Sequence, residues 1–74
     1  MRFGVAFLDP PYDVHVAPAI LDRVAAWLEP GGIAVVKHFW RTAPPSVDTL
    51  EPFRTRRFGE TALTFMHARH EEAS

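Results

Sequence analysis

The chain has 74 residues, of which 47% are hydrophobic and 23% are charged, and its formal net charge is −1. This length allows one small domain with a limited core, and the near-neutral charge excludes a global basic field, so any contact with nucleic acid must come from local patches. The sequence contains no cysteine, which excludes disulfides, thiolate metal sites and a cysteine nucleophile.

The first predicted element is a strand over residues 3–8. This run is almost wholly apolar, which is typical of a strand buried on both faces in a parallel sheet. Pairing must stop at the prolines, because Pro10 has no N–H for the ladder and Pro11 holds Pro10 extended. We therefore expect Asp9 and Tyr12 at the carboxyl end of a central strand, which is the edge at which open α/β sheets bind ligands.

The Asp-Pro-Pro-Tyr sequence at this edge suits chemistry on an exocyclic amine, whose lone pair is delocalised into its ring. The Asp9 carboxylate and the Pro10 carbonyl can accept the two amine hydrogens and localise the lone pair, while Tyr12 stacks on the base. A structural alternative is a strand end followed by a polyproline-like turn, in which Asp9 caps and Tyr12 packs. Four residues by themselves leave both interpretations open.

One amphipathic helix and a second buried strand follow. Apolar residues recur at helical spacing across residues 18–28, and Pro18 suits the first turn because its missing N–H is harmless there. The Pro-Gly-Gly sequence at residues 30–32 is expected to end the helix, with glycine supplying a positive φ. The apolar run of residues 33–36 then predicts a strand that continues to His38 and lies parallel to the first, which makes a βαβ unit.

A loop and a β-hairpin complete the predicted fold. Residues 39–48 contain two prolines and are typical of a surface loop. Residues 49–58 and 61–68 predict two strands that turn at Gly59-Glu60. Pro52 lacks the N–H that a central strand needs, so the first of these strands is expected to lie at an edge or to begin after Pro52.

One helix can cover only one face of such a sheet. Parallel strands usually have both faces covered, and no second helix is predicted. Phe3, Val5, Phe7 and Val35 are therefore expected to be partly exposed in the chain by itself. On this physical argument, we expect the chain to lack the segment that covers its second face.

Three runs resemble a known group of enzymes. Residues 7–12 resemble motif IV of amino-directed, S-adenosylmethionine-dependent methyltransferases, a motif that DNA adenine methyltransferases share. Residues 28–36 and 57–65 are similar to one branch of that group, the bacterial 16S rRNA guanine-N2 methyltransferases. The resemblance spans Phe3 to about Ala68, and the closing Phe-Gly-Glu-Thr hairpin is the part that points to the rRNA branch.

The resemblance implies an α/β fold, part of a Rossmann-like methyltransferase sheet, in which a βαβ unit is followed by an antiparallel β-hairpin. The amino-terminal half of this family carries a glycine-rich strand-turn-helix that cradles the methyl donor, and no Gly-x-Gly pattern occurs here. We therefore expect residues 1–74 to be the C-terminal part of a class I methyltransferase domain whose N-terminal cofactor-binding half is absent. Only Asp9 would lie at the edge of the donor pocket.

The implied activity is methyl transfer from the cofactor S-adenosyl-L-methionine to the exocyclic N2 amine of a guanine in 16S rRNA, during assembly of the small ribosomal subunit. The implied catalytic residues are Asp9, Pro10, Pro11 and Tyr12, with Asp9 and the Pro10 carbonyl on the amine and Tyr12 stacked on the flipped base. We expect the isolated chain to be inactive, and to require its missing N-terminal half or self-association.

Two other functions stay open at this point. Motif IV alone is equally consistent with a fragment of an adenine-N6 nucleic-acid methyltransferase. The chain is also consistent with a non-catalytic remnant, or with an interaction domain that pairs through its uncovered sheet.

Five basic residues are candidate RNA contacts. Lys37 stands where the family commonly has an acid, and Arg41 follows it in the same loop region. On a strand, Arg54 and Arg56 share one face while Arg57 points to the other. Contact with RNA phosphates competes with plainer roles, namely a solvated loop and an edge strand that discourages sheet-to-sheet pairing.

The remaining aromatic and histidine residues predict no further site. Trp40 is expected to form a hydrophobic lid over the sheet edge, with stacking on a base as the alternative. The four histidines show no ligand spacing, so no metal is expected. The first apolar run is too short to span a membrane and no signal-peptide cleavage pattern follows it, so we expect a cytoplasmic protein.

Overall fold

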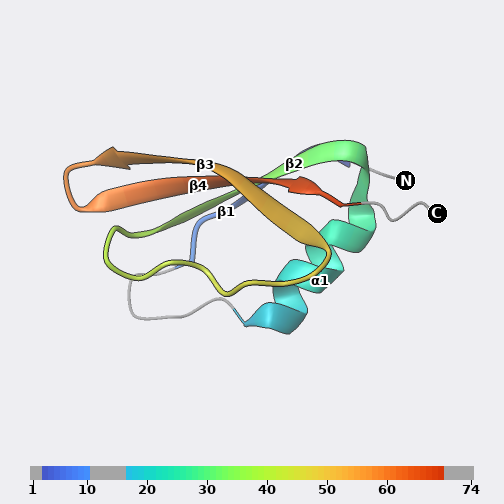
Figure 1. Ribbon diagram of the computed structural model, residues 1–74, viewed down its shortest axis with the longest axis horizontal. Coiled ribbons are helices and arrows are strands. Elements are labelled where there is room, and N and C mark those ends of the chain that lie inside the picture. Colours follow the sequence, from blue (N-terminus) through green and yellow to red (C-terminus); the bar gives the residue numbers. More distant parts are fainter. Residues whose placement is uncertain (1–2, 11–16, 70–74) are drawn as a thin grey trace.

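The computed structural model of the chain is a four-stranded sheet with one helix against one of its faces (Figure 1). The structure describes residues 3–10 and 17–69. Its elements in chain order are β1 (Phe3–Leu8), α1 (Pro18–Trp27), β2 (Leu28–Phe39), β3 (Leu50–Phe58) and β4 (Thr61–Ala68). The strand order is β1-β2-β4-β3, with β1 parallel to β2 and the other pairs antiparallel. The predicted α/β fold, a βαβ unit followed by a hairpin, is confirmed.

Helix α1 begins at Pro18, as predicted, and covers one face of the sheet. Its N-cap residue, Ala17, makes no side-chain capping bond, so the proline supplies the favourable start. Leu21 and Ala25 are buried against the sheet. Trp27, on the predicted apolar stripe, is 56% exposed, and its ring centroid lies 6.4 Å from that of Phe3 on the outer strand β1.

The predicted exit of the helix through residues 30–32 is wrong. The helix ends at Trp27, and Leu28 already has extended backbone angles, φ −83° and ψ 144°, with its N–H donating to the carbonyl of Ala25. The physical reason is burial, because the extended conformation places the Leu28 side chain in the core, where it is 1% exposed. The positive φ of 80° is found at Gly31, inside the first part of β2.

The core lies between α1 and the sheet. Its buried members come from the helix and from three of the strands: Leu21, Ala25, Leu28, Ala34, Val36, Leu50, Met66 and Ala68. Ala6, Leu8, Val24 and Val47 pack against this cluster. Every strand therefore contributes side chains to the core on the side of the sheet that α1 covers.

The opposite side of the sheet, here called the open face, is apolar and uncovered within the described part of the chain. It consists of Val5 and Phe7 from β1, Ile33 and Val35 from β2, Phe65 from β4 and Phe53 from β3. The register aligns Phe7 with Val35 and Val35 with Phe65, and the Phe53 and Phe65 rings lie 6.3 Å apart. Val5 is 65% exposed and Phe7 is 59% exposed.

Two expectations about the first strand are therefore wrong for this structure. Strand β1 is not buried on both faces, because α1 covers only one of them. It is also not central, because within the described residues it pairs with β2 alone and forms one edge of the sheet. The predicted partial exposure is confirmed for Phe3, Val5 and Phe7, but it is wrong for Val35, which is only 9% exposed because β1 and β4 flank it on both sides.

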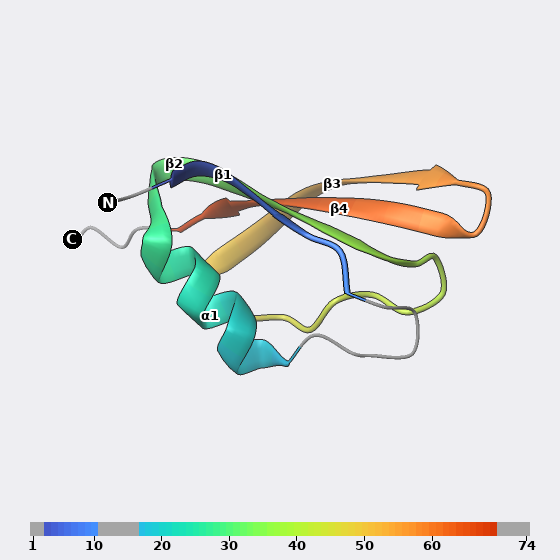
Figure 2. The same ribbon diagram turned by 180° about the vertical axis from the view of Figure 1, so that it is seen from behind.

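The hairpin forms as predicted. Strands β3 and β4 pair across a turn in which Gly59 has a φ of 64°, a conformation that favours glycine. Strand β3 is the other edge of the sheet, and its ladder shifts register between Pro52 and Arg54, where the proline cannot donate. Both views place the tip of this hairpin at the end of the molecule away from α1 (Figure 1 and Figure 2).

A small polar network crosses three strands of the covered face. The His38 Nδ1 lies 2.8 Å from the carbonyl oxygen of Phe39, which can only accept, so Nδ1 carries the proton. In the neutral ring Nε2 then accepts from the Thr64 hydroxyl at 2.7 Å. The Thr64 oxygen is 3.2 Å from the Thr55 hydroxyl, which donates to it. This chain of hydrogen bonds satisfies Thr64, a polar residue that is only 5% exposed.

Candidate functional site

Asp9 and Pro10 lie directly after β1, at the carboxyl edge of the sheet. The parallel register aligns Leu8 with Val36, so the next residue on each strand is brought to the same edge. Asp9 Oδ1 accordingly lies 3.7 Å from Nζ of Lys37. The edge predicted from the prolines is therefore the edge at which Asp9 is found.

The remaining two residues of the predicted catalytic loop, Pro11 and Tyr12, lie outside the described residues. Their roles stay predictions. The Asp9 side chain is 52% exposed, which leaves its carboxylate oxygens open to a substrate group. A carboxylate and the neighbouring Pro10 carbonyl together offer two acceptors and no donor at this edge.

Lys37 replaces the acid that the resemblance leads one to expect, and the structure gives it a partner. Its ammonium group pairs with Asp9, and its side chain is 41% exposed. An ion pair this exposed stabilises the fold by about 0–1 kcal/mol. The ion pair therefore adds little to the stability of the fold. Its effect is to keep the Asp9 carboxylate beside β2 and to give the Lys37 ammonium group a carboxylate partner.

The three arginines of the hairpin divide between the two faces as predicted. Arg54 aligns with Phe65 and Arg56 with Leu63, on the side of the open face. Arg57 aligns with Ala62, which is buried on the covered side. The hairpin therefore does not present these three charges as one patch.

Sequence reasoning missed a cluster that brings two distant segments together. The Cζ of Arg57 lies 3.7 Å from the centroid of the Trp40 ring, and the Cζ of Arg41 lies 4.7 Å from it. The backbone N–H of Trp40 also donates to the backbone carbonyl of Glu60 at 2.9 Å. The residues Trp40, Arg41 and Arg57, here called the Trp40 cluster, thus join the end of β2 to the hairpin turn. The predicted lid role of Trp40 is not what these contacts indicate.

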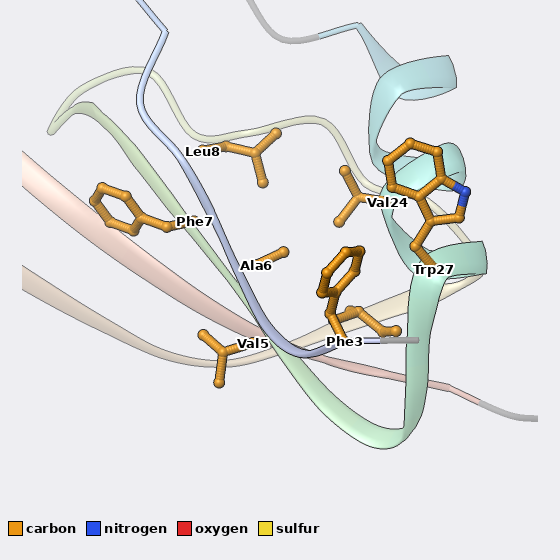
Figure 3. A pocket seen from close by; sticks show the side chains of 8 residues that line it. Phe3, Val5, Ala6, Phe7, Leu8, Val24 and Trp27 are labelled. Atoms are coloured by element: carbon orange, nitrogen blue, oxygen red, sulfur yellow. The ribbon is translucent and has the colours of Figure 1, made fainter. Parts of the chain in front are cut away.

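An apolar pocket of about 280 Å³ lies at the outer edge of β1, beside α1 (Figure 3). Figure 3 shows Val24 and Trp27 on the helix side and Phe3, Ala6 and Leu8 on the strand side. The lining residues are Phe3, Val5, Ala6, Phe7, Leu8, Val24, Trp27 and Leu28. A pocket without polar side chains, beside a strand edge that pairs with no other described strand, is suited to receive more protein and not a polar cofactor.

Within residues 3–10 and 17–69, no group of three or more His, Cys, Asp or Glu side chains is arranged to hold a metal ion. None of the helices in that part of the chain has the length and apolar character needed to cross a membrane.

Solved structures share this fold. The chain is similar to a conserved hypothetical protein from Streptococcus pyogenes, with 25% identity and a TM-score of 0.78, over 92% of this chain and 44% of that one. It is similar to a "putative methylase" from Haemophilus influenzae, with 18% identity and a TM-score of 0.75, over 92% and 44% of the two chains. It is also similar to a "putative methyltransferase" from Escherichia coli, with 17% identity and a TM-score of 0.75, over 92% of this chain and 40% of that one.

The chain thus spans less than half the length of these solved structures, and its fold is part of a methyltransferase-like fold. A comparison with curated proteins found no match. The family described as Conserved hypothetical protein 95 matches residues 1–67, which is nearly the whole chain. This protein therefore belongs to the Conserved hypothetical protein 95 family.

Proposed function

We propose that this chain carries the catalytic loop of an S-adenosylmethionine-dependent methyltransferase acting on the exocyclic N2 amine of a guanine in 16S rRNA. The observation that carries the proposal is the position of Asp9 and Pro10 at the carboxyl edge of the parallel pair β1 and β2. Support comes from the fold, which the chain shares with proteins named as methylases. The choice of guanine N2 rests on the resemblance of the hairpin run at residues 57–65.

The residues at this edge act on the amine. The Asp9 carboxylate and the Pro10 carbonyl each accept one amine hydrogen, which draws the nitrogen lone pair out of the ring and aims it at the methyl group. The donor, when bound, supplies an electrophilic methyl carbon whose bond to sulfur breaks as the bond to nitrogen forms. The methylated nitrogen is then cationic and loses its proton readily, so Asp9 need not be a strong base.

The described residues fit the edge of a donor site and not a whole one. Asp9 is exposed, and its only ion-pair partner within the described residues is Lys37. The pocket beside β1 is lined by apolar side chains and offers no polar side chain to a ribose or an amino-acid group. The donor must therefore be held mainly by protein other than residues 3–10 and 17–69.

We assign that role to a donor-binding half-domain that packs on β1. A strand added in parallel to the unpaired edge of β1 would satisfy its free N–H and C=O groups, and helices attached to that strand would fill the apolar pocket and cover the open face. The size of the solved relatives supports this partner, since the matched part is only 40–44% of their chains. Self-association through the same face is the competing outcome.

The test is a chimera in which residues 3–68 replace the matched segment of the Streptococcus pyogenes relative. We expect the chimera to transfer a labelled methyl group to guanine in a 16S rRNA fragment, and Asp9→Ala to lower the rate about 100-fold or more. Asp48→Ala is the matched control, since Asp48 is exposed and far along the chain from β1. An unchanged rate in Asp9→Ala, or methylation of adenine-only RNA instead, would contradict the proposal.

A further inference from the structure

The Trp40 cluster holds two positive charges close to one aromatic ring. Arg57 lies 3.7 Å and Arg41 lies 4.7 Å from the ring centroid. Guanidinium groups are attracted to the electron-rich face of an indole, so Trp40 holds both of them in defined positions. The hydrogen bond from the backbone N–H of Trp40 to the backbone carbonyl of Glu60 ties the backbone at Trp40 to the hairpin turn. The cluster is therefore organised by tertiary structure and not by flexible side chains alone.

Neither charge has a carboxylate partner among residues 3–10 and 17–69. Within the described part of the chain the ion pairs are those of Lys37 with Asp9 and of Arg69 with Glu51. Arg57 uses its Nε to donate to the carbonyl of Gly59 at 2.8 Å, which leaves its terminal amino groups available. Two guanidinium groups that share one aromatic ring, and that have no carboxylate partner among the described residues, are suited to bind phosphate.

The position of the cluster relates it to the proposed methylation edge. Lys37 is paired with Asp9, and Trp40 follows three residues later at the end of the same strand, a distance of about 10 Å at the rise of a strand. An RNA strand whose guanine amine reaches Asp9 would therefore carry its flanking phosphates past the cluster. The target base must be unpaired or flipped for its amine to be reached, which favours single-stranded RNA.

We propose that Trp40, Arg41 and Arg57 form a binding site for the phosphodiester backbone of single-stranded RNA beside Asp9. This inference rests on the proposed function and sharpens it, because it separates two hairpin arginines of like charge. Arg57 belongs to the site, whereas Arg54 lies on the side of the open face. Trp40 acts as a positioning residue for the two guanidinium groups.

The experiment measures the binding of a labelled, guanine-containing single-stranded RNA by fluorescence anisotropy, in about 50 to about 200 mM salt. We expect Arg41→Gln and Arg57→Gln each to weaken binding about tenfold, and each to reduce the slope of log affinity against log salt by about 0.7. Arg54→Gln is the matched control, with the same loss of charge on the same hairpin, and should leave the slope within error.

The role of Trp40 has its own readout. Trp40→Ala should weaken binding about as much as the loss of one arginine, and Trp40→Phe should restore most of it, because a phenyl ring also holds guanidinium groups. The salt slopes of Arg41→Gln and Arg57→Gln, if unchanged, would overturn the inference. An equal fall of the slope in Arg54→Gln would overturn it too, since it would indicate a diffuse charge effect.

Folding and catalysis are kept separate from this test. The same variants are measured in the 74-residue chain and in the chimera, where the covered open face guards against loss of fold. Binding is read without a methyl donor. A chimera that binds RNA through the cluster but transfers no methyl group would refute the proposed function alone, whereas methyl transfer with unchanged slopes would refute the cluster alone.

Discussion

The two faces of the sheet are built from the same kinds of side chain, but one face is buried and the other is largely exposed. Leu28, Val36 and Met66 on the covered face are no more than 2% exposed, because α1 lies over them. On the open face Val5 and Phe7 are more than half exposed, although their neighbours are equally apolar. An apolar pattern therefore predicts that a face will be buried, but it does not identify the segment that covers the face. A contiguous apolar face of this kind marks an interaction surface.

The largest effect on stability is expected on the covered face. Leu28→Ala removes a side chain that is 1% exposed in the core, so the free energy of unfolding should fall by about 2–5 kcal/mol through lost burial and a residual cavity. Urea unfolding followed by circular dichroism measures this. A loss below about 0.5 kcal/mol would mean that the core between α1 and the sheet is not the one described.

A smaller effect is expected from the polar network of the same face. Thr64→Val removes the hydroxyl that donates to His38 and accepts from Thr55, and should lower the free energy of unfolding by about 1 kcal/mol. Thr55→Val is the control, since Thr55 is exposed and sits at the end of the network. Equal losses in both variants would show that the buried position of Thr64 is not what makes its hydroxyl matter.

The smallest effect on the stability of the isolated chain is expected from a substitution on the open face. This substitution is the most direct test of the difference between the covered face and the open face. Phe7→Ser should change the free energy of unfolding of the isolated chain by no more than about 0.5 kcal/mol, because Phe7 is already 59% exposed. In the chimera the same substitution should cost about 2 kcal/mol or more, because the side chain is buried there by the second half. Equal effects in the two proteins would contradict the assignment of a partner to this face.

The same measurement separates the two possible partners. Sedimentation of the isolated chain reports self-association, and Phe7→Ser should abolish it if the open face joins two copies. A chain that stays monomeric at all concentrations, together with a large effect in the chimera, favours the donor-binding half-domain.

Most of the backbone could be predicted from residue pattern alone. The prolines after Leu8 ended the first strand, Pro18 began the helix, and Gly59 turned the hairpin. The exit of the helix was misplaced because Gly31 has a positive φ but does not cap the helix. Local rules identify a residue that needs this conformation, and they do not say whether core burial of Leu28 has already ended the helix at Trp27.

By itself, the sequence determined the elements, the parallel pairing and the edge at which Asp9 lies, since prolines, glycines and apolar periodicity act through neighbouring residues. Only the tertiary structure decided that β1 is an edge strand, that Lys37 pairs with Asp9 and that Arg57 meets Trp40. These are contacts between segments far apart in the chain. They depend on strand order and on which side chain faces which, and no local preference encodes either.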